Sequence, residues 1–302
     1  MKLDREVIAR LEIRPGEPAG LASRDPATSP ALLRDGLGGR RREIEDQDLE
    51  AFRASLATAQ ELLWANATHA VLLVLQALDA AGKDGTIKHV MSGVNPQGCE
   101  VFSFKQPSEE ELRHDFLWRC AKVTPERGRI GIFNRSYYED VLVVRVHPEL
   151  LAGRHLPPAT ADGDTLWRQR YEDINAFEKH LVRNGTRVVK IFLHVSKQEQ
   201  RRRFLERLDE PAKNWKFSSA DLAERSFFDD YQLAYEEALT ATSTPWAPWY
   251  VVPADHKHAM RALVGGILVD AVGQLDLHPP SPGPEEQEAL RAARRALASE
   301  HA

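Results

Sequence analysis

The stretch HAVLLVLQALDAAGKDGTI, residues 69–87, joins a long apolar run to a turn that contains glycine and lysine. The apolar part is typical of a strand that is buried on both faces of a parallel sheet. Gly82 and Lys83 follow it at the position of a phosphate-binding loop in the pattern G-x-x-x-x-G-K-[ST]. Two positions depart from that pattern, because Ala77 replaces the first glycine and Asp84 replaces the hydroxyl that holds magnesium.

The residues of this turn are suited to hold a phosphate group. Gly82 and Gly85 allow the backbone to direct N–H groups toward an anion, and Lys83 supplies a cation. The alternative is a tight turn without a ligand, but the position directly after an apolar strand favours the phosphate site. The predicted phosphate-binding residues of this segment are Ala80, Ala81, Gly82, Lys83, Asp84, Gly85, Thr86 and Lys88.

Asp79, just after the predicted strand, is the nearest acid available to hold a metal ion. Mg²⁺ prefers oxygen ligands and is commonly bound by one or two carboxylates together with water and substrate phosphate. We therefore predict Asp79 as the metal ligand, with a turn-forming or capping carboxylate as the structural alternative.

The rest of the chain alternates between apolar runs and helical patterns. This alternation predicts an α/β fold with three layers, in which a five-stranded parallel sheet carries helices on both faces. We expect an irregular N-terminal arm over residues 1–46, one α/β domain over 47–277, and a proline-rich linker with a short helix over 278–302. The predicted strands are 69–78, 100–104, 128–133, 186–195 and 249–254.

The polar segment NRSYYED, residues 134–140, follows the third predicted strand. Ligands of such sheets bind beyond the carboxyl ends of the strands, which brings this segment to the Lys83 loop. Arg135 is a natural forked donor to phosphoryl oxygens, and an ion pair with Glu139 at i+4 is an alternative that does not exclude this role. Asn134 stands where an acid is usual and is a weaker metal ligand.

The composition limits the class of protein. A chain of 302 residues with 42% hydrophobic and 28% charged residues can bury a full core without disulfides. The net charge of −5 does not favour a nucleic-acid partner. Cys99 and Cys120 form no disulfide framework or metal motif, and no apolar run reaches membrane-spanning length. We therefore expect a cytoplasmic protein with no membrane or nucleic-acid partner.

Four stretches in this order resemble the polyphosphate kinase 2 family. They are QALDAAGKDGTIKHVMSGVNPQG (76–98), GRIGIFNRSYYEDVLVVRVHP (128–148), KNWKFSSADL (213–222) and STPWAPWYVVPADHK (243–257). The likeness covers most of the chain and is strongest for the subgroup that acts on nucleoside monophosphates as well as diphosphates. The asparagine at position 134 goes with the subgroup that accepts AMP.

The resemblance implies a P-loop kinase-like fold with a helical lid at about residues 205–228. It also implies reversible, magnesium-dependent phosphoryl transfer between inorganic polyphosphate and adenine or guanine nucleotides, with Mn²⁺ as an alternative ion, and a homo-oligomer, either a dimer or a tetramer. The catalytic residues that it implies are Asp79, Lys83, Asn134, Arg135 and Glu139, with Lys213, Trp215 and Lys216 on the lid.

A long polyanion would also give the local clusters of basic residues a use, because it needs a track of cations whose attraction falls with salt. For each residue of such a track, an ordinary solvated helix face is the alternative. Trp215 and Trp246 are open in the same way between contact with a base and a place in the core or lid hinge. The candidates for the track are Arg119, Lys122, Arg203 and Arg207, with Lys213 and Lys216 of the lid.

Three functions follow from these patterns, and a polyphosphate:nucleotide phosphotransferase leads. A small-molecule kinase that uses ATP would keep the loop and change the acceptor. A non-catalytic module that senses nucleotide or phosphate would explain the missing hydroxyl and the neutral Asn134. The joint presence of Asp79, Lys83 and Arg135 argues against the sensor.

Overall fold

The computed structural model describes residues 3–28, 41–154, 156–157, 163–216 and 218–300. Its centre is a parallel sheet of five strands in the order β2-β3-β1-β4-β5. The strands are β1 (Ala70–Ala77), β2 (Cys99–Ser103), β3 (Ile130–Asn134), β4 (Thr186–His194) and β5 (Trp249–Pro253). The predicted three-layer α/β fold is therefore confirmed.

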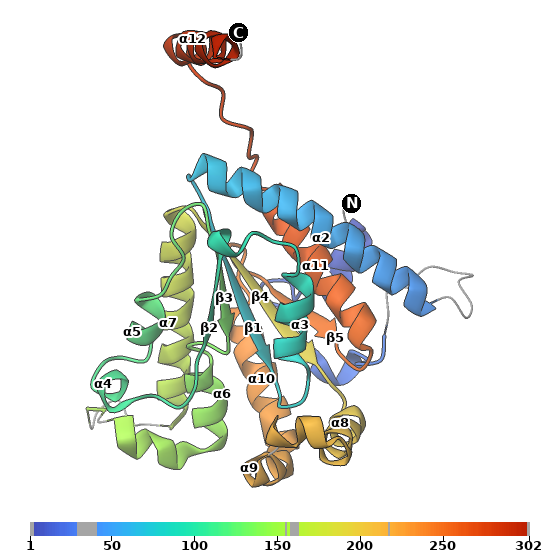
Figure 1. Cartoon of the computed structure of the whole chain (residues 1–302). Coiled ribbons are helices and arrows are strands. Elements are labelled where there is room, and N and C mark those ends of the chain that lie inside the picture. Colours follow the sequence, from blue (N-terminus) through green and yellow to red (C-terminus); the bar gives the residue numbers. More distant parts are fainter. Residues whose placement is uncertain (1–2, 29–40, 155, 158–162, 217, 301–302) are drawn as a thin grey trace.

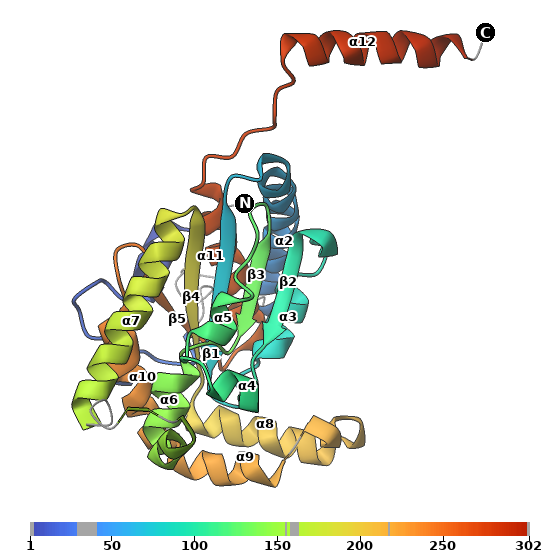
Figure 2. The same ribbon diagram turned by 90° about the vertical axis from the view of Figure 1, so that its left-hand side faces the viewer.

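Helices connect these strands and cover both faces of the sheet. Figure 2 shows α2, α3 and α11 on one face and α6, α7 and α10 on the other. The α-helices are α1 (Arg5–Leu11), α2 (Arg41–Asn66), α3 (Lys83–Val90), α4 (Glu109–Leu112), α5 (Trp118–Ala121), α6 (Glu139–Val146), α7 (Gly163–Arg183), α8 (Lys197–Asp209), α9 (Ser219–Glu224), α10 (Phe228–Thr242), α11 (Lys257–Gly273) and α12 (Pro284–Ser299). Short 3₁₀ turns are η1 (Leu21–Ser23), η4 (Pro96–Gly98), η5 (Pro148–Arg154), η7 (Pro211–Lys216) and η8 (Arg225–Phe227).

Strand β1 occupies the middle of the sheet because its side chains avoid water on both faces. Every residue of Ala70–Ala77 is buried, and the strand pairs with β3 on one side and β4 on the other. Leu75 of β1 is in register with Asn134, the last residue of β3. The loop after β1 and the segment after β3 therefore begin side by side at the carboxyl edge of the sheet.

The predicted lid, at about residues 205–228, comprises the end of α8 together with η7, α9 and η8, and these elements lie at this carboxyl edge beneath the sheet (Figures 1 and 2). Ser196 caps α8 by accepting a hydrogen bond from the Glu199 N–H, as its spacing predicts. Ser218 caps α9 in the same manner, through Ala220. Helices α8 and α9 thus have local start signals, and their position at the carboxyl edge of the sheet comes from tertiary contacts.

The N-terminal segment differs from the predicted irregular arm. Asp4 caps helix α1, and Leu11 and Ile13 are buried in the core. The Ile13 N–H donates to the Trp249 carbonyl at 2.8 Å, so this segment pairs with the outer edge of β5. Helix α2 also begins earlier than expected, at Arg41. The prediction missed this order because the edge of a strand, which is remote in sequence, supplies the partner.

A second difference concerns the segment SEEELRHDFLWRCAKV, residues 108–123, whose Ser108 and Glu111 spacing predicts a capping box and one continuous helix. Its capping box with Glu111 is present, but α4 ends after a single turn. Asp115 accepts a hydrogen bond from the Leu117 N–H at 2.9 Å, and α5 starts at Trp118. An aspartate that bonds the backbone two residues on favours a turn over a continued helix, which explains the break.

The C-terminal helix α12 is exposed along its whole length and stands away from the sheet in both ribbon views (Figures 1 and 2). Within the linker and terminal helix expected over residues 278–302, helix α12 spans Pro284–Ser299. No helix in the described ranges has the length and hydropathy needed to span a membrane.

Candidate active site

The loop after β1 has the backbone geometry of an anion site. Gly82 has a left-handed φ of 108° and precedes the first residue of α3, so its lack of a side chain allows the turn. Lys83 Nζ donates to the Ala77 carbonyl at 2.6 Å, which holds the ammonium group beneath the loop. Burial lowers the pKa of Lys83, and the nearby Asp79 carboxylate opposes that shift. The loop therefore combines a helix N-terminus with a cation.

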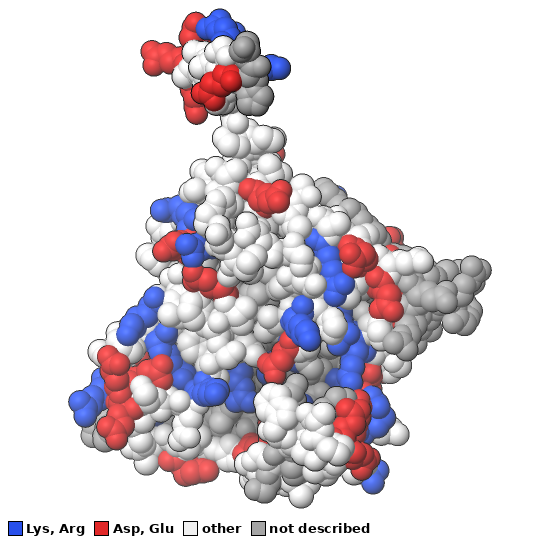
Figure 3. Space-filling view, viewed as in Figure 1, with Lys and Arg blue, Asp and Glu red and all other residues white. Residues whose placement is uncertain are grey.

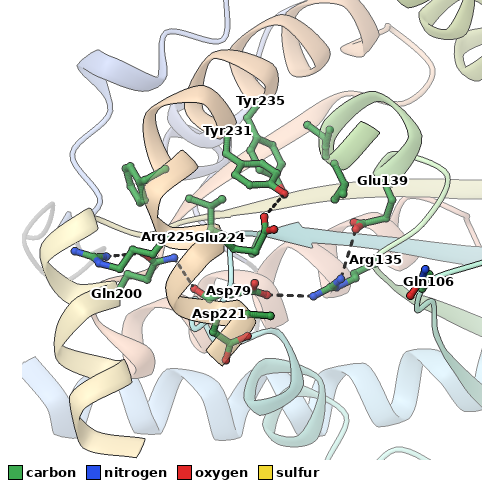
Figure 4. Close-up of a pocket in the computed structure, with 16 residues that line it drawn as sticks. Asp79, Gln106, Arg135, Glu139, Gln200, Asp221, Glu224, Arg225, Tyr231 and Tyr235 are labelled. Atoms are coloured by element: carbon green, nitrogen blue, oxygen red, sulfur yellow. Dashed lines mark hydrogen bonds and ion pairs between the residues drawn. The ribbon is translucent and has the colours of Figure 1, made fainter. Parts of the chain in front are cut away.

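Arg135 connects the loop to the segment after β3. Its Nη2 lies 3.1 Å from Asp79 Oδ1, and its Nη1 lies 3.6 Å from Glu139 Oε2 (Figure 4). The predicted i+4 pair with Glu139 is thus present together with a second carboxylate. Arg135 also has a φ of +65°, a conformation that costs free energy in any residue other than glycine. The contacts of Arg135 with the two acids offset this strain and hold the guanidinium between them.

Glu139 lies beside Arg135, and its side chain is 15% exposed. Burial raises the pKa of Glu139, while the positive charges of Arg135 and Lys83 lower it. Gln76 is a fully buried side chain of β1. In the amide orientation that satisfies its oxygen and nitrogen, Gln76 donates to Glu139 Oε1 at 3.0 Å. Glu139 is therefore fixed from two sides and orients Arg135.

A cavity of about 400 Å³ opens beside this cluster, a volume within the range of small-ligand sites. Asp79, Arg135 and Glu139 form its charged side. Figure 4 shows Tyr231 and Tyr235 of α10 opposite them. The rest of the lining is partly apolar and partly polar, and comprises Ala77, Leu78, Leu142, Val143, Ala220, Phe228, Gln106, Gln200, Asp221, Glu224 and Arg225.

Asn134 has an unpaired oxygen near the loop. Its Nδ2 donates to Asp84 Oδ1 at 2.8 Å, which explains one use of the aspartate that replaces the usual hydroxyl. Its buried Oδ1 has no hydrogen-bond partner among the described residues. The described side chains contain no group of three or more His, Cys, Asp or Glu that would cage a metal. Asp79 and this amide oxygen are instead the kind of sparse oxygen set that Mg²⁺ shares with water and phosphate.

Two predicted members of the cationic track are not exposed. Arg203 is only 4% exposed, and each of its nitrogen atoms donates to a neighbouring carbonyl or to Glu199. Arg119 is buried beside the Phe104 ring and donates to the Lys105 carbonyl at 2.8 Å. Their place on an accessible track is therefore wrong in this structure, because the chain itself occupies these guanidinium groups.

The other basic candidates lie at the surface or outside the described side chains. Lys122 is exposed, with its ammonium group 4.0 Å from the centre of the Trp118 ring, and Lys88 is exposed on α3. Arg207 pairs with Asp221 of the lid at 3.9 Å. Figure 3 shows Lys and Arg side chains on both sides of the face around α3, interspersed with acids. The side chains of Lys213 and Lys216, both predicted to face the site, lie outside the described part.

The two tryptophans occupy different environments. Trp215 is 78% exposed on η7. Trp246 packs against the hydrophobic core, with Lys179 Nζ 4.7 Å from the ring centre. The described lining of the cavity includes neither ring. The core interpretation of Trp246 thus agrees with its packing.

Several polar residues of the site were absent from the predictions. Gln76 carried a usable signal, because it is a polar residue within an otherwise apolar buried strand. Gln200 and Arg225 carried none, because each looks like an ordinary polar residue of a charged segment. Tyr231 and Tyr235 lie in residues 225–241, whose pattern predicts a helix. The sequence does not show that this helix faces the site.

Four features define a phosphotransferase of the P-loop kinase-like class. They are a parallel sheet, a lysine loop after its central strand, an arginine after the neighbouring strand and a predicted lid at the carboxyl edge. The family described as Polyphosphate kinase 2 matches residues 40–278 of the chain. The chain belongs to this family, as its motifs predicted.

Named relatives and a solved structure support the same assignment. The chain is 54% identical over 242 residues to the ADP-polyphosphate phosphotransferase of Rhodopseudomonas palustris, covering 80% of this chain and 84% of the relative. It is 47% identical over 245 residues to the AMP/ADP-polyphosphate phosphotransferase of Meiothermus ruber, covering 81% and 86%. The crystal structure of Polyphosphate Kinase 2 from Arthrobacter aurescens TC1 superposes with a TM-score of 0.84 at 41% identity, covering 96% of this chain and 95% of that chain.

Proposed function

We propose that this chain transfers a phosphoryl group from inorganic polyphosphate to ADP and to AMP, in a reversible reaction. Membership of the polyphosphate kinase 2 family supports the reaction class. One observation carries the proposal to particular residues, namely the cluster of Asp79, Arg135 and Glu139 beside the Lys83 loop and at the edge of a ligand-sized cavity. Relatives named for ADP and for AMP/ADP support both acceptors.

The acceptor in this reaction is itself a phosphate group. It is ionised near neutral pH, so no side chain has to remove a proton from it. Catalysis then consists of positioning the two phosphate groups and neutralising charge on the transferred group. Lys83 and the N–H groups of the loop supply fixed positive charge on one side.

Arg135 supplies the second positive group. Its planar fork pairs with two carboxylates, and it can exchange the Asp79 oxygen for phosphoryl oxygens of similar geometry. Glu139 keeps the guanidinium oriented during that exchange, because its own position is fixed by burial and by Gln76. This division makes Arg135 a catalytic residue and Glu139 its support.

The oxygen donors at the loop fit Mg²⁺, with Mn²⁺ as an alternative ion of similar ligand preference. Asp79 would hold the ion, and the unpaired Asn134 amide oxygen is the second donor of the right kind. When bound, the ion would neutralise charge on the phosphates. One carboxylate and one amide oxygen would then come from the chain, and phosphate and water would supply the other ligands.

The apolar side of the cavity fits the nucleoside of the acceptor. Leu142, Val143 and Phe228 line the cavity together with the charged cluster and give it an apolar part. Lys88, an exposed cation on the helix that starts at the loop, is available to the polyphosphate chain. The acceptor and the donor would then approach the Lys83 loop from different sides.

The test is a transfer assay with purified protein, Mg²⁺, long-chain polyphosphate and either ADP or AMP. We expect ATP from ADP and ADP from AMP, with no product after chelation of the metal. A parallel assay supplies ATP with a small-molecule acceptor and no polyphosphate, which detects the conventional kinase. Folded protein that forms no product from polyphosphate with either nucleotide contradicts the proposal.

A further inference from the structure

Helix α8 holds the phosphate loop from below through two buried side chains. Gln200 Nε2 donates to the Asp79 carbonyl at 3.1 Å. Arg203 Nη1 donates to the Ala80 carbonyl at 3.1 Å and to the Ala81 carbonyl at 2.6 Å. Three successive carbonyl groups of the loop therefore point toward one helix.

These contacts determine where the opposite sides of the same peptide groups point. In a trans peptide the C=O and N–H vectors are antiparallel, so a carbonyl that points to α8 directs the following N–H away from it. Ala80 also has a left-handed φ of +62°, which is unfavourable for a residue with a side chain. The contacts from α8 offset this cost and keep the loop in its strained shape.

Arg203 is held in place by further contacts on its other side. Its Nη2 donates to the Ala254 carbonyl at 2.5 Å, after strand β5, and its Nε donates to Glu199 Oε1 at 2.7 Å. The side chain thus joins the loop after β1 to the segment after β5. The side chain of Arg202, the preceding residue, is 59% exposed and pairs with Glu199 and Glu206 instead.

Gln200 also connects the loop to the end of the lid. Its Oε1 accepts a hydrogen bond of 2.6 Å from Arg225 Nη1, directly after α9 (Figure 4). Arg225 Nη1 donates in addition to the Lys197 carbonyl at 2.9 Å. The neighbouring Glu224 accepts from the Tyr231 hydroxyl at 2.8 Å. A single buried amide therefore contacts both the Asp79 backbone and the lid.

We propose that Gln200 and Arg203 are positioning residues that hold the loop in its phosphate-binding shape, and that Gln200 couples this shape to the lid through Arg225. The effect on rate rests on the proposed phosphotransfer. The effect on the loop itself does not. Neither side chain needs to touch a substrate for this role.

The central variant is Gln200→Leu, which keeps the approximate size of the side chain and removes both hydrogen bonds. Gln198→Leu is the matched control, because Gln198 is an exposed glutamine of the same helix. Gln200→Glu separates the two contacts, since a carboxylate still accepts from Arg225 and cannot donate to the Asp79 carbonyl. Arg225→Leu leaves the contact of Gln200 with the Asp79 carbonyl in place and removes the contacts of Arg225 with Gln200 and with the Lys197 carbonyl.

Two measurements are made on every variant, namely the kinetics of ATP formation and hydrogen exchange of loop amides 80–86. We expect Gln200→Leu to lower kcat by about tenfold, the equivalent of one 1.4 kcal/mol step, with KM for ADP changed by less than about threefold. We expect loop exchange to quicken by about tenfold or more, as the local opening free energy falls. Gln198→Leu should match the wild type in both measurements.

The other variants divide the effect. Gln200→Glu should retain fast loop exchange and a low kcat, because the Asp79 carbonyl remains without its donor. Arg225→Leu should change kcat in the wild type and change it much less in Gln200→Leu, because contacts in one chain are non-additive. Independent, additive effects of the two substitutions would overturn the coupling to the lid.

Loop exchange in Gln200→Leu that equals that of Gln198→Leu would overturn the positioning role, whatever the rates are. A fall in kcat that matches only the fraction of unfolded protein would do the same. If no variant and no wild-type sample makes ATP, the phosphotransfer proposal fails, and the exchange measurement still decides whether α8 holds the loop.

Discussion

Two groups of charged residues meet at the segment after β3, and they differ in what they can exchange with solvent. Arg135 faces the cavity between Asp79 and Glu139, and its side chain is 40% exposed. Lys190 and Glu178 lie behind the same segment, with both side chains 0% exposed and 2.7 Å apart. The segment 134–140 thus contributes Arg135 and Glu139 to an ion cluster that opens to the cavity. The residues between them contact an ion pair that is closed to solvent.

The closed pair is saturated by the protein. Tyr137 and Tyr138 both donate to Glu178 Oε1 at 2.9 Å, and Lys190 Nζ donates to Glu178 and to the Thr242 carbonyl at 2.6 Å. Burial raises the pKa of Glu178, and Lys190 lowers it again. A pair with no access to solvent cannot receive a phosphate, so it acts on the shape of the segment. The open cluster can replace a carboxylate by a phosphoryl group.

The largest expected effect lies in the open site. Asp79→Ala and Lys83→Ala should each lower the rate of ATP formation by about 10³-fold or more, because Lys83 is the proposed fixed positive charge at the transferred group and Asp79 is the proposed ligand of the metal ion. The thermal unfolding midpoint should change little, since neither side chain belongs to the buried core. Steady-state assays with a melt of each variant check this, and wild-type rates in either variant would refute the site.

The next effect breaks the closed pair. Lys190→Met should lower the free energy of unfolding by about 3–5 kcal/mol at neutral pH, because it leaves the Glu178 carboxylate buried without its cation. Denaturant titration measures this loss. A loss below about 1 kcal/mol, the usual value for an exposed pair, would show that the pair is not desolvated as the structure has it.

The same variant should depend on pH in a defined direction. The pKa of Glu178 is raised in the folded state, and loss of Lys190 raises it further. Above the ordinary pKa of glutamate, the unfolded chain releases a proton that the folded chain retains, so stability falls as pH rises. Lys190→Met should therefore be more stable at pH 5 than at pH 8. Adding Glu178→Gln should remove that slope.

Replacement of the Arg135 guanidinium by a lysine ammonium group tests how much the open cluster depends on bidentate geometry. Arg135→Lys keeps one positive charge and loses the bidentate geometry, so the rate should fall by about 10–100-fold while the fold is retained. The expected change is smaller than that for Asp79→Ala. A lysine variant with the wild-type rate would mean that charge alone, without geometry, suffices.

An exposed pair gives the smallest effect and serves as a reference. Arg14 and Glu17 lie 3.8 Å apart with both side chains largely exposed. Arg14→Ala should change the free energy of unfolding by less than about 0.5 kcal/mol and leave the rate unchanged. A loss of more than 1 kcal/mol, measured by the same titration, would show that surface charge matters more to this fold than the comparison assumes.

The fold could be predicted because its information is local. Apolar segments indicated the strands, although EVFSF (100–104) also contains polar residues, and short polar caps such as Ser108 and Ser196 marked helix starts. The N-terminal segment was missed because its partner, the Trp249 carbonyl, lies far along the chain. Local patterns could not reveal that pairing.

The site was predictable where chemistry and strand ends coincide. Asp79, Lys83 and Arg135 follow strands, and the topology brings strand ends together. Arg203 was misplaced because it stands in a run of arginines that looks solvated. Its phase on α8 held the missing signal, since Arg203 is buried beside Phe204 and Gln200 while Arg202 faces solvent.

The division between the two ion clusters is tested most directly by the transfer rate per folded molecule in two variants. One is Asp79→Ala, and the other is the double variant Glu178→Gln with Lys190→Met, which makes the buried pair neutral. We expect the double variant to stay within about threefold of the wild-type kcat, and Asp79→Ala to lose about 10³-fold or more. Equal losses in the two variants would contradict the account, because the buried pair would then share in the chemistry.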